Sequence, residues 1–111
     1  MIRKDLFQKV GGFDEENLKV AFNDIDLCLK VSEAGSKVVY VPLAELVHHE
    51  SKSRGDDFSA DKIERFTKEN EHMYQKWGKR IKRDPYYNPN LSLKNERFEL
   101  AFPPQKAEIA K

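Results

Sequence analysis

The sequence has little of three things: cysteine, long apolar runs and net charge. Its one cysteine, Cys28, cannot form an internal disulfide, which fits a reducing compartment. No apolar segment approaches the roughly 18 residues of a membrane span, and none follows the N-terminal charges as in a signal peptide. The 20 basic and 19 acidic residues give a net charge of +1, which offers no argument for a nucleic-acid partner. These absences predict a soluble, cytoplasmic chain.

The chain has 111 residues and a mean hydropathy of −0.78, so it has the size of one small domain, or of a piece of a larger one, with a thin core. Apolar spacing predicts three helices. The first covers Arg3–Val10 and ends at Gly11 and Gly12, which supply left-handed geometry. The second begins with Asn23 as N-cap and ends at Glu33-Ala34-Gly35. Its side chains expected to face the core are Ile25, Cys28 and Leu29, with Leu27 as a further candidate.

The longest helix is expected from Ser59 to Ile81. Its apolar residues recur at spacings of three, four or their sum: Ile63, Phe66, Met73, Trp77 and Ile81. Tyr74 is expected to join Trp77 in the core. Two extended segments precede this helix, a buried strand over Lys37–Val41 and a second piece over Ala44–His49. Residues 51–57 are expected to form a polar loop, and a folded portion over 1–102 is expected to be followed by a flexible tail over 103–111.

Three polar clusters stand out against this pattern: NDIDLC at 23–28, HHESKSRG at 48–55 and DPYYNPNL at 84–91. Together with GGFDE at 11–15, and in this order, they resemble the C-terminal part of bacterial family 2 glycosyltransferases, which have the GT-A fold. The resemblance covers about residues 1–93. It implies an α/β fold, the acceptor-side half of a GT-A domain with a few strands plus helices and an incomplete sheet on its own. The nucleotide-binding half, with its Asp-x-Asp metal motif, is missing here, so the chain alone is expected to be inactive.

Asp24 is the candidate catalytic base. A sugar transfer with inversion needs a carboxylate to take the proton from the attacking hydroxyl, and the start of a helix favours the ionised form. In the resembling family this role belongs to the Asp of a Glu-Asp or Asn-Asp pair, here Asn23 and Asp24. From the pattern alone, the two residues could merely cap a helix. Asp26 is not read as half of an Asp-x-Asp metal motif, because side chains two apart on a helix point roughly 200° apart. It is expected to be structural or acceptor-facing.

The cluster at 48–55 is the candidate donor site. The resemblance implies that His48 completes the shell of Mn²⁺ or Mg²⁺ beside the sugar diphosphate. Ser53 and Arg54 follow in a loop whose hydroxyls and cations suit phosphate oxygens. The plainer interpretations are a surface histidine pair and a solvated loop. In the third cluster, Tyr86 and Tyr87 are read as a structural latch, with acceptor contact as the alternative.

The resemblance implies a nucleotide-sugar donor, a glycan acceptor and a place in bacterial surface polysaccharide or glycoconjugate synthesis, in the cytoplasm or at the inner face of the membrane. Without a complete sheet, apolar residues would be partly uncovered, which predicts a homodimer; these residues are Leu27, Val38, Val39, Tyr40 and Leu46. A non-catalytic interaction module is the alternative. A small metal-binding domain built from His48, His49, Glu50 and His72 is disfavoured, because no spacing matches a structural zinc site.

Overall fold

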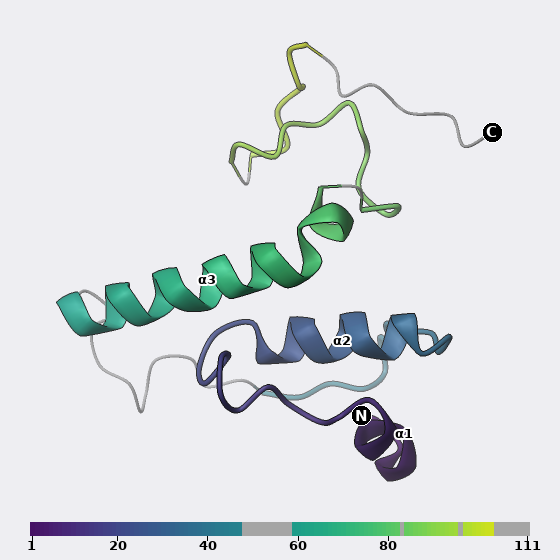
Figure 1. Cartoon of the computed structure of the whole chain (residues 1–111). Helices are drawn as coiled ribbons and strands as arrows, with labels where there is room; N and C mark the ends of the chain where they lie inside the picture. The colour runs from purple at the N-terminus through teal and green to yellow at the C-terminus, as the bar shows by residue number, and fades with distance from the viewer. Residues whose placement is uncertain (48–58, 83, 96, 104–111) are drawn as a thin grey trace. The chain divides into compact units, whose positions relative to one another are not determined.

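The computed structural model describes residues 1–47, 59–82, 84–95 and 97–103. These residues form three helices, in the order α1 (Lys4–Lys9), α2 (Asn23–Glu33) and α3 (Ala60–Ile81) (Figure 1). The chain divides into two compact units, Met1–Lys76 and Trp77–Lys111, which are described separately. None of the helices in these ranges is long and apolar enough to cross a membrane.

Helix α1 ends where the sequence predicts. Gly11 and Gly12 have φ angles of 81° and 62°, in the left-handed region that glycine adopts without strain. The Gly12 N–H donates to the Phe7 carbonyl at 2.9 Å, which closes the helix end. A Cβ atom on Gly12 would lie 3.1 Å from Phe7 Cε1, so the position is crowded as well as left-handed.

Helix α2 lies close to its expected bounds but begins and packs differently. Phe22, with φ of 64°, occupies the N-cap position, so the expectation that Asn23 is the N-cap is wrong. The predicted end is confirmed, with Ala34 as C-cap and Gly35 at φ of 79°. The expected core face is wrong for Ile25 and Cys28, which are exposed, whereas Leu27 and Leu29 are partly buried. The buried residues of the helix are Asp26 and Val31. The most buried residue of α2 is an ion-paired carboxylate, Asp26, and the spacing of apolar residues cannot predict its burial.

Helix α3 confirms the prediction of a long helix over 59–81. Met73 and Trp77 are buried, with 3% and 5% of their surfaces exposed, but Ile63 and Phe66 are about half exposed. Tyr74 is also half exposed, so its expected place in the core is wrong. Glu69, only 3% exposed, is the buried residue of the first half of α3 that the apolar pattern could not predict.

The expected α/β architecture is wrong for the residues described. Their structure is helical and irregular, and it contains no strand, only an isolated antiparallel bridge between Leu91 and Leu100. The predicted buried strand over Lys37–Val41 and the described part of the second extended piece, residues 44–47, are irregular and exposed. A strand acquires its hydrogen bonds from a neighbouring strand, and none of the described segments supplies one. Apolar side chains consequently face solvent along this segment: Val38, Val39, Tyr40, Val41, Leu43, Leu46 and Val47.

The unit that begins at Trp77 is organised by short-range hydrogen bonds. The Ser92 N–H donates to the Glu99 carbonyl and the Ala101 N–H donates to the Asn90 carbonyl, both at 2.7 Å, on either side of the bridge. The Tyr87 hydroxyl donates to the Ser92 carbonyl at 3.0 Å. The latch expected of Tyr86 and Tyr87 stays a prediction, since Tyr87 bonds only five residues along the chain and Tyr86 is exposed.

Candidate functional site

Asp24 is the second residue of α2 and its side chain is exposed. Its Oδ1 accepts a hydrogen bond from the Ile25 N–H at 2.9 Å. The neighbouring Asn23, the first residue of the helix, is partly buried. The first turn of α2 thus presents the Asp24 carboxylate to solvent, where a hydroxyl group could approach it.

Asp26, in the same turn, lies in an opposite environment. Its surface is completely buried, and its two oxygens pair with two ammonium groups. Oδ1 lies 2.7 Å from Lys76 Nζ and Oδ2 lies 3.0 Å from Lys30 Nζ. The Lys30 ammonium also donates to the Gly12 carbonyl at 2.6 Å. This arrangement suits a structural carboxylate that ties α2 to α3 and to the turn after α1.

Asp14 extends the same ionic network. Its Oδ1 accepts from both the backbone N–H and the side-chain amide of Asn17, each at 3.0 Å. Its Oδ2 lies 3.1 Å from His72 Nε2 and 3.8 Å from Lys76 Nζ. Burial acts to raise the pKa of Asp14, but the Asn17 hydrogen bonds and the neighbouring His72 outweigh it and hold the pKa below its ordinary value of 3.8.

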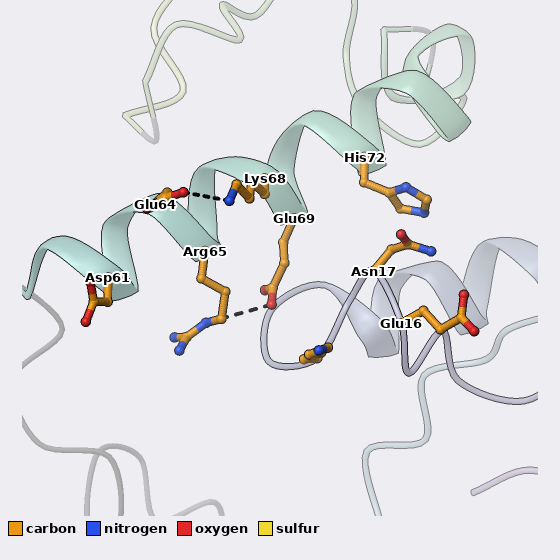
Figure 2. Close-up of a pocket in the computed structure, with 9 residues that line it drawn as sticks. Glu16, Asn17, Asp61, Glu64, Arg65, Lys68, Glu69 and His72 are labelled. Atoms are coloured by element: carbon orange, nitrogen blue, oxygen red, sulfur yellow. Dashed lines mark hydrogen bonds and ion pairs between the residues drawn. The ribbon is translucent and has the colours of Figure 1, made fainter.

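Glu69 is bound by backbone amides and also pairs with one side chain, since its Oε1 lies 3.8 Å from Arg65 Nε. Its two carboxylate oxygens accept from consecutive backbone amides, Val20 N–H at 3.2 Å and Ala21 N–H at 2.6 Å. Figure 2 shows Glu69 and His72 projecting from α3 toward the loop that carries Asn17. Glu69 therefore fixes the backbone just before Phe22 and the start of α2.

The open cavity of Figure 2 lies between this loop and the α3 residues from Asp61 to His72, with a volume of about 420 Å³. Its lining carries charges of both signs: Glu16, Asn17, Lys19, Asp61, Glu64, Arg65, Lys68, Glu69 and His72. Two of these side chains neutralise each other, since Lys68 Nζ lies 2.6 Å from Glu64 Oε1. The lining therefore gives no argument for a polyanionic ligand.

The structure describes only part of the predicted site. Asn23, Asp24 and Asp26 share the first turn of α2, and Tyr86 and Tyr87 lie in the unit that begins at Trp77, with Tyr86 fully exposed. His48, Ser53 and Arg54 lie outside the described residues. Within the ranges that are described, no group of three or more His, Cys, Asp or Glu side chains could hold a metal ion.

Sequence reasoning missed the residues of α3 that hold the site. Glu69, His72 and Lys76 are spaced by three and four residues and so share one helix face. That spacing was a usable signal for a common face. The spacing did not identify the partners. Glu69 contacts Ala21, 48 residues away in sequence, and His72 contacts Asp14, 58 residues away.

Several known proteins are similar in sequence to this chain. Uncharacterized protein y4gI from Sinorhizobium fredii is 48% identical over 103 residues, which make up 93% of this chain and 11% of that protein. O-antigen biosynthesis protein RfbC from Myxococcus xanthus is 37% identical over 95 residues, 84% of this chain and 7% of that protein. N-acetylglucosaminyl-diphospho-decaprenol L-rhamnosyltransferase from Mycobacterium tuberculosis is 42% identical over 57 residues, 51% of this chain and 18% of that protein.

The chain is thus related to proteins that are named for glycosyl transfer and polysaccharide synthesis. It spans less than a fifth of the length of each of these relatives. No family model matches the chain, and no solved structure matches it. The relationship therefore supports a glycosyltransferase-related function, and does so for one segment of those longer proteins.

Proposed function

We propose that this chain forms the acceptor side of a family 2 glycosyltransferase, which transfers a sugar from a nucleotide-sugar donor to a glycan acceptor with inversion at the anomeric carbon. The observation that carries the proposal is the position of Asp24, a solvent-facing carboxylate at the start of α2 in a chain related to glycosyltransferases. The product belongs to a bacterial surface polysaccharide or glycoconjugate, assembled in the cytoplasm or at the inner face of the membrane.

In this mechanism Asp24 is the general base. Its carboxylate takes the proton of an acceptor hydroxyl as that oxygen attacks the anomeric carbon. The new glycosidic bond forms while the bond from the anomeric carbon to the diphosphate breaks, and the nucleoside diphosphate leaves. The N-terminal end of α2 favours the negative charge that the base needs before it accepts the proton. The buried Asp26 takes no part in proton transfer, because both its oxygens are held by lysines.

The donor side of the proposal rests on the resemblance alone. His48 would hold Mn²⁺ or Mg²⁺, and Ser53 and Arg54 would contact the donor phosphates. The metal would neutralise the charge that develops on the leaving diphosphate. The described part of the chain offers no cluster of metal ligands that fits such an ion, so no step of the mechanism is assigned to it.

The test is Asp24→Asn in the natural polypeptide that carries this segment, at its full length. Release of nucleoside diphosphate from a panel of nucleotide sugars, in the presence of glycan acceptors, is measured together with donor binding. We expect turnover to be abolished and donor binding to be nearly unchanged. Asp61→Asn is the matched control, since Asp61 is also an exposed carboxylate in the first turn of a helix. Turnover retained in Asp24→Asn would remove Asp24 from the mechanism.

A second candidate function is an interaction or dimerisation module. The observation that favours it is the run of exposed apolar side chains over residues 38–47, because exposed apolar patches mark interaction sites. In this alternative, two copies cover these side chains in a homodimer, and the Asp24 turn has no chemical role. Turnover that depends on Asp24 would argue against a purely structural module.

A further inference from the structure

We infer that Glu69 and Lys76 of α3 are positioning residues for Asp24, a role that rests on the proposed function of Asp24 as base. The two residues hold the chain on either side of Asp24 in sequence. Glu69 accepts from the backbone of Val20 and Ala21, and Lys76 pairs with Asp26. Asp24 therefore lies on a short segment that is fixed at both ends to one helix.

The contact before Asp24 fixes backbone direction. The Ala21 N–H to Glu69 Oε2 distance is 2.6 Å, and the Glu69 carboxylate is almost completely buried. The next residue, Phe22, adopts a left-handed conformation with φ of 64°, which costs a non-glycine residue free energy and persists where the surroundings hold it. Its ring also packs against Phe66 of α3, with ring centroids 5.3 Å apart. The chain thus enters α2 along a direction that α3 imposes.

The contact after Asp24 fixes the first helical turn. The Asp26 N–H donates to the Phe22 carbonyl at 2.9 Å, which is the first hydrogen bond of α2. The Asp26 side chain is held at 2.7 Å by Lys76 and at 3.0 Å by Lys30. Rotation or fraying of this turn would separate a buried carboxylate from its ammonium partners, which is costly. The Asp24 carboxylate is therefore carried on a turn with little freedom to move.

This rigidity has a chemical consequence. A general base must lie within hydrogen-bond distance of the hydroxyl it deprotonates, and displacement of a reacting group by about 1 Å can cost on the order of 100-fold in rate. Lys76 and Glu69 do not touch the reacting atoms in this arrangement. Their effect should appear in kcat, while the donor KM, which depends on other residues, should change little.

The first test is independent of activity and uses amide NMR of this chain. The variant Lys76→Met removes the ammonium group, Lys76→Arg keeps a cation at the same place, and Lys79→Met is a control at an exposed lysine of the same helix. In Lys76→Met we expect shifted Asp24 and Ile25 amide signals and faster hydrogen exchange at the Asp26 amide, with α1 signals unchanged. Arginine should restore the wild-type signals. Unchanged Asp24, Ile25 and Asp26 amides in Lys76→Met would overturn the inference.

A milder variant covers the case in which Lys76→Met fails to fold. Glu69→Gln keeps the shape of the side chain and one carbonyl acceptor but removes its charge. We expect the Ala21 and Asp24 amide signals to shift in Glu69→Gln, whereas Glu71→Gln, at an exposed position two residues along, should leave them in place. Unshifted signals in Glu69→Gln would overturn the assignment of Glu69.

The second test measures turnover in the natural full-length polypeptide. We expect Lys76→Met to lower kcat on the order of 10- to 100-fold with donor KM nearly unchanged, and Lys76→Arg to recover most of the loss. Full kcat in Lys76→Met, with Asp24→Asn inactive, would overturn the positioning role while leaving the proposed function intact. Turnover retained in Asp24→Asn would instead overturn the proposed function. It would also remove any catalytic purpose for the contacts of Glu69 and Lys76, even where the NMR shifts are found.

Discussion

Lys76 Nζ lies 2.7 Å from Asp26 Oδ1 and joins the last part of one helix to the first turn of another. The carboxylate is completely buried, whereas about a third of the lysine side chain remains exposed. Water therefore reaches the Lys76 side chain but not the Asp26 carboxylate. A second lysine, Lys30 of α2 itself, lies 3.0 Å from the other carboxylate oxygen, Asp26 Oδ2.

Asp26→Asn should lower the free energy of unfolding by about 3 kcal/mol, because it leaves two ammonium groups facing a neutral amide in a buried place. Urea denaturation followed by circular dichroism would measure the loss. The matched control is Asp24→Asn, the same substitution in the same helical turn at an exposed position, which should cost at most about 1 kcal/mol through the helix dipole. Equal losses in the two variants would contradict a special role for the buried pair.

Gly12→Ala should destabilise the chain by about 1–2 kcal/mol, since alanine disfavours the left-handed backbone. The added Cβ would also lie 3.1 Å from the Phe7 ring. Gly78→Ala is the control, because Gly78 lies within α3 with open space around its Cβ position. That change should be stabilising by about 0.5–1 kcal/mol. Opposite signs of the two shifts in urea midpoint are the expected result.

Asp14 should give the chain a specific acid sensitivity. Since hydrogen bonds from Asn17 and the neighbouring His72 outweigh burial and hold its pKa below 3.8, the unfolded chain binds more protons than the folded chain in this range. The contribution is present above the unfolded pKa and is lost as the pH falls through the lower, folded pKa. The urea midpoint from pH 6 to pH 2.5 should therefore fall less steeply in Asp14→Asn. Parallel curves for the two proteins would contradict this assignment.

The exposed segment 38–47 should drive self-association. We expect light scattering at micromolar concentration to report a mass above the 13.0 kDa of the monomer, and Val39→Lys to return the chain toward the monomer. Ile63→Lys is the control, since Ile63 is a half-exposed apolar residue outside this segment. A wild-type chain that is monomeric under these conditions would refute the dimer.

The helices could be predicted from the sequence because their signals are local. The spacing of apolar residues, and the glycines that follow α1 and α2, were enough to predict the position of α1, the end of α2 and the length of α3. The strands could not be predicted correctly, because whether Val38 and Val39 pair with anything depends on segments elsewhere, and the residues described supply no partner strand. The start of α2 was misjudged because Phe22 occupies the cap in a conformation that side-chain preferences do not favour.

The candidate site shows the same division. Asp24 was proposed from a short motif, and its predicted place in the first turn of a helix is confirmed, whereas its role as base stays a prediction. The partners of Asp26, by contrast, were not found, because Lys76 lies in another helix and its spacing carries no information about what it faces. The roles of His48, Ser53 and Arg54, which lie outside the residues described, stay predictions.

The ionic network around Asp26 also bears on how the chain folds. Asp14 meets His72 across 58 residues of sequence, and Ala21 meets Glu69 across 48. Closing loops of this length costs chain entropy before any of these contacts form, and high sequence separation slows folding. The first 35 residues, made alone, would leave the Asp26 carboxylate with Lys30 but without Lys76. The α2 turn should therefore become fixed only when α3 docks, as a late step of folding.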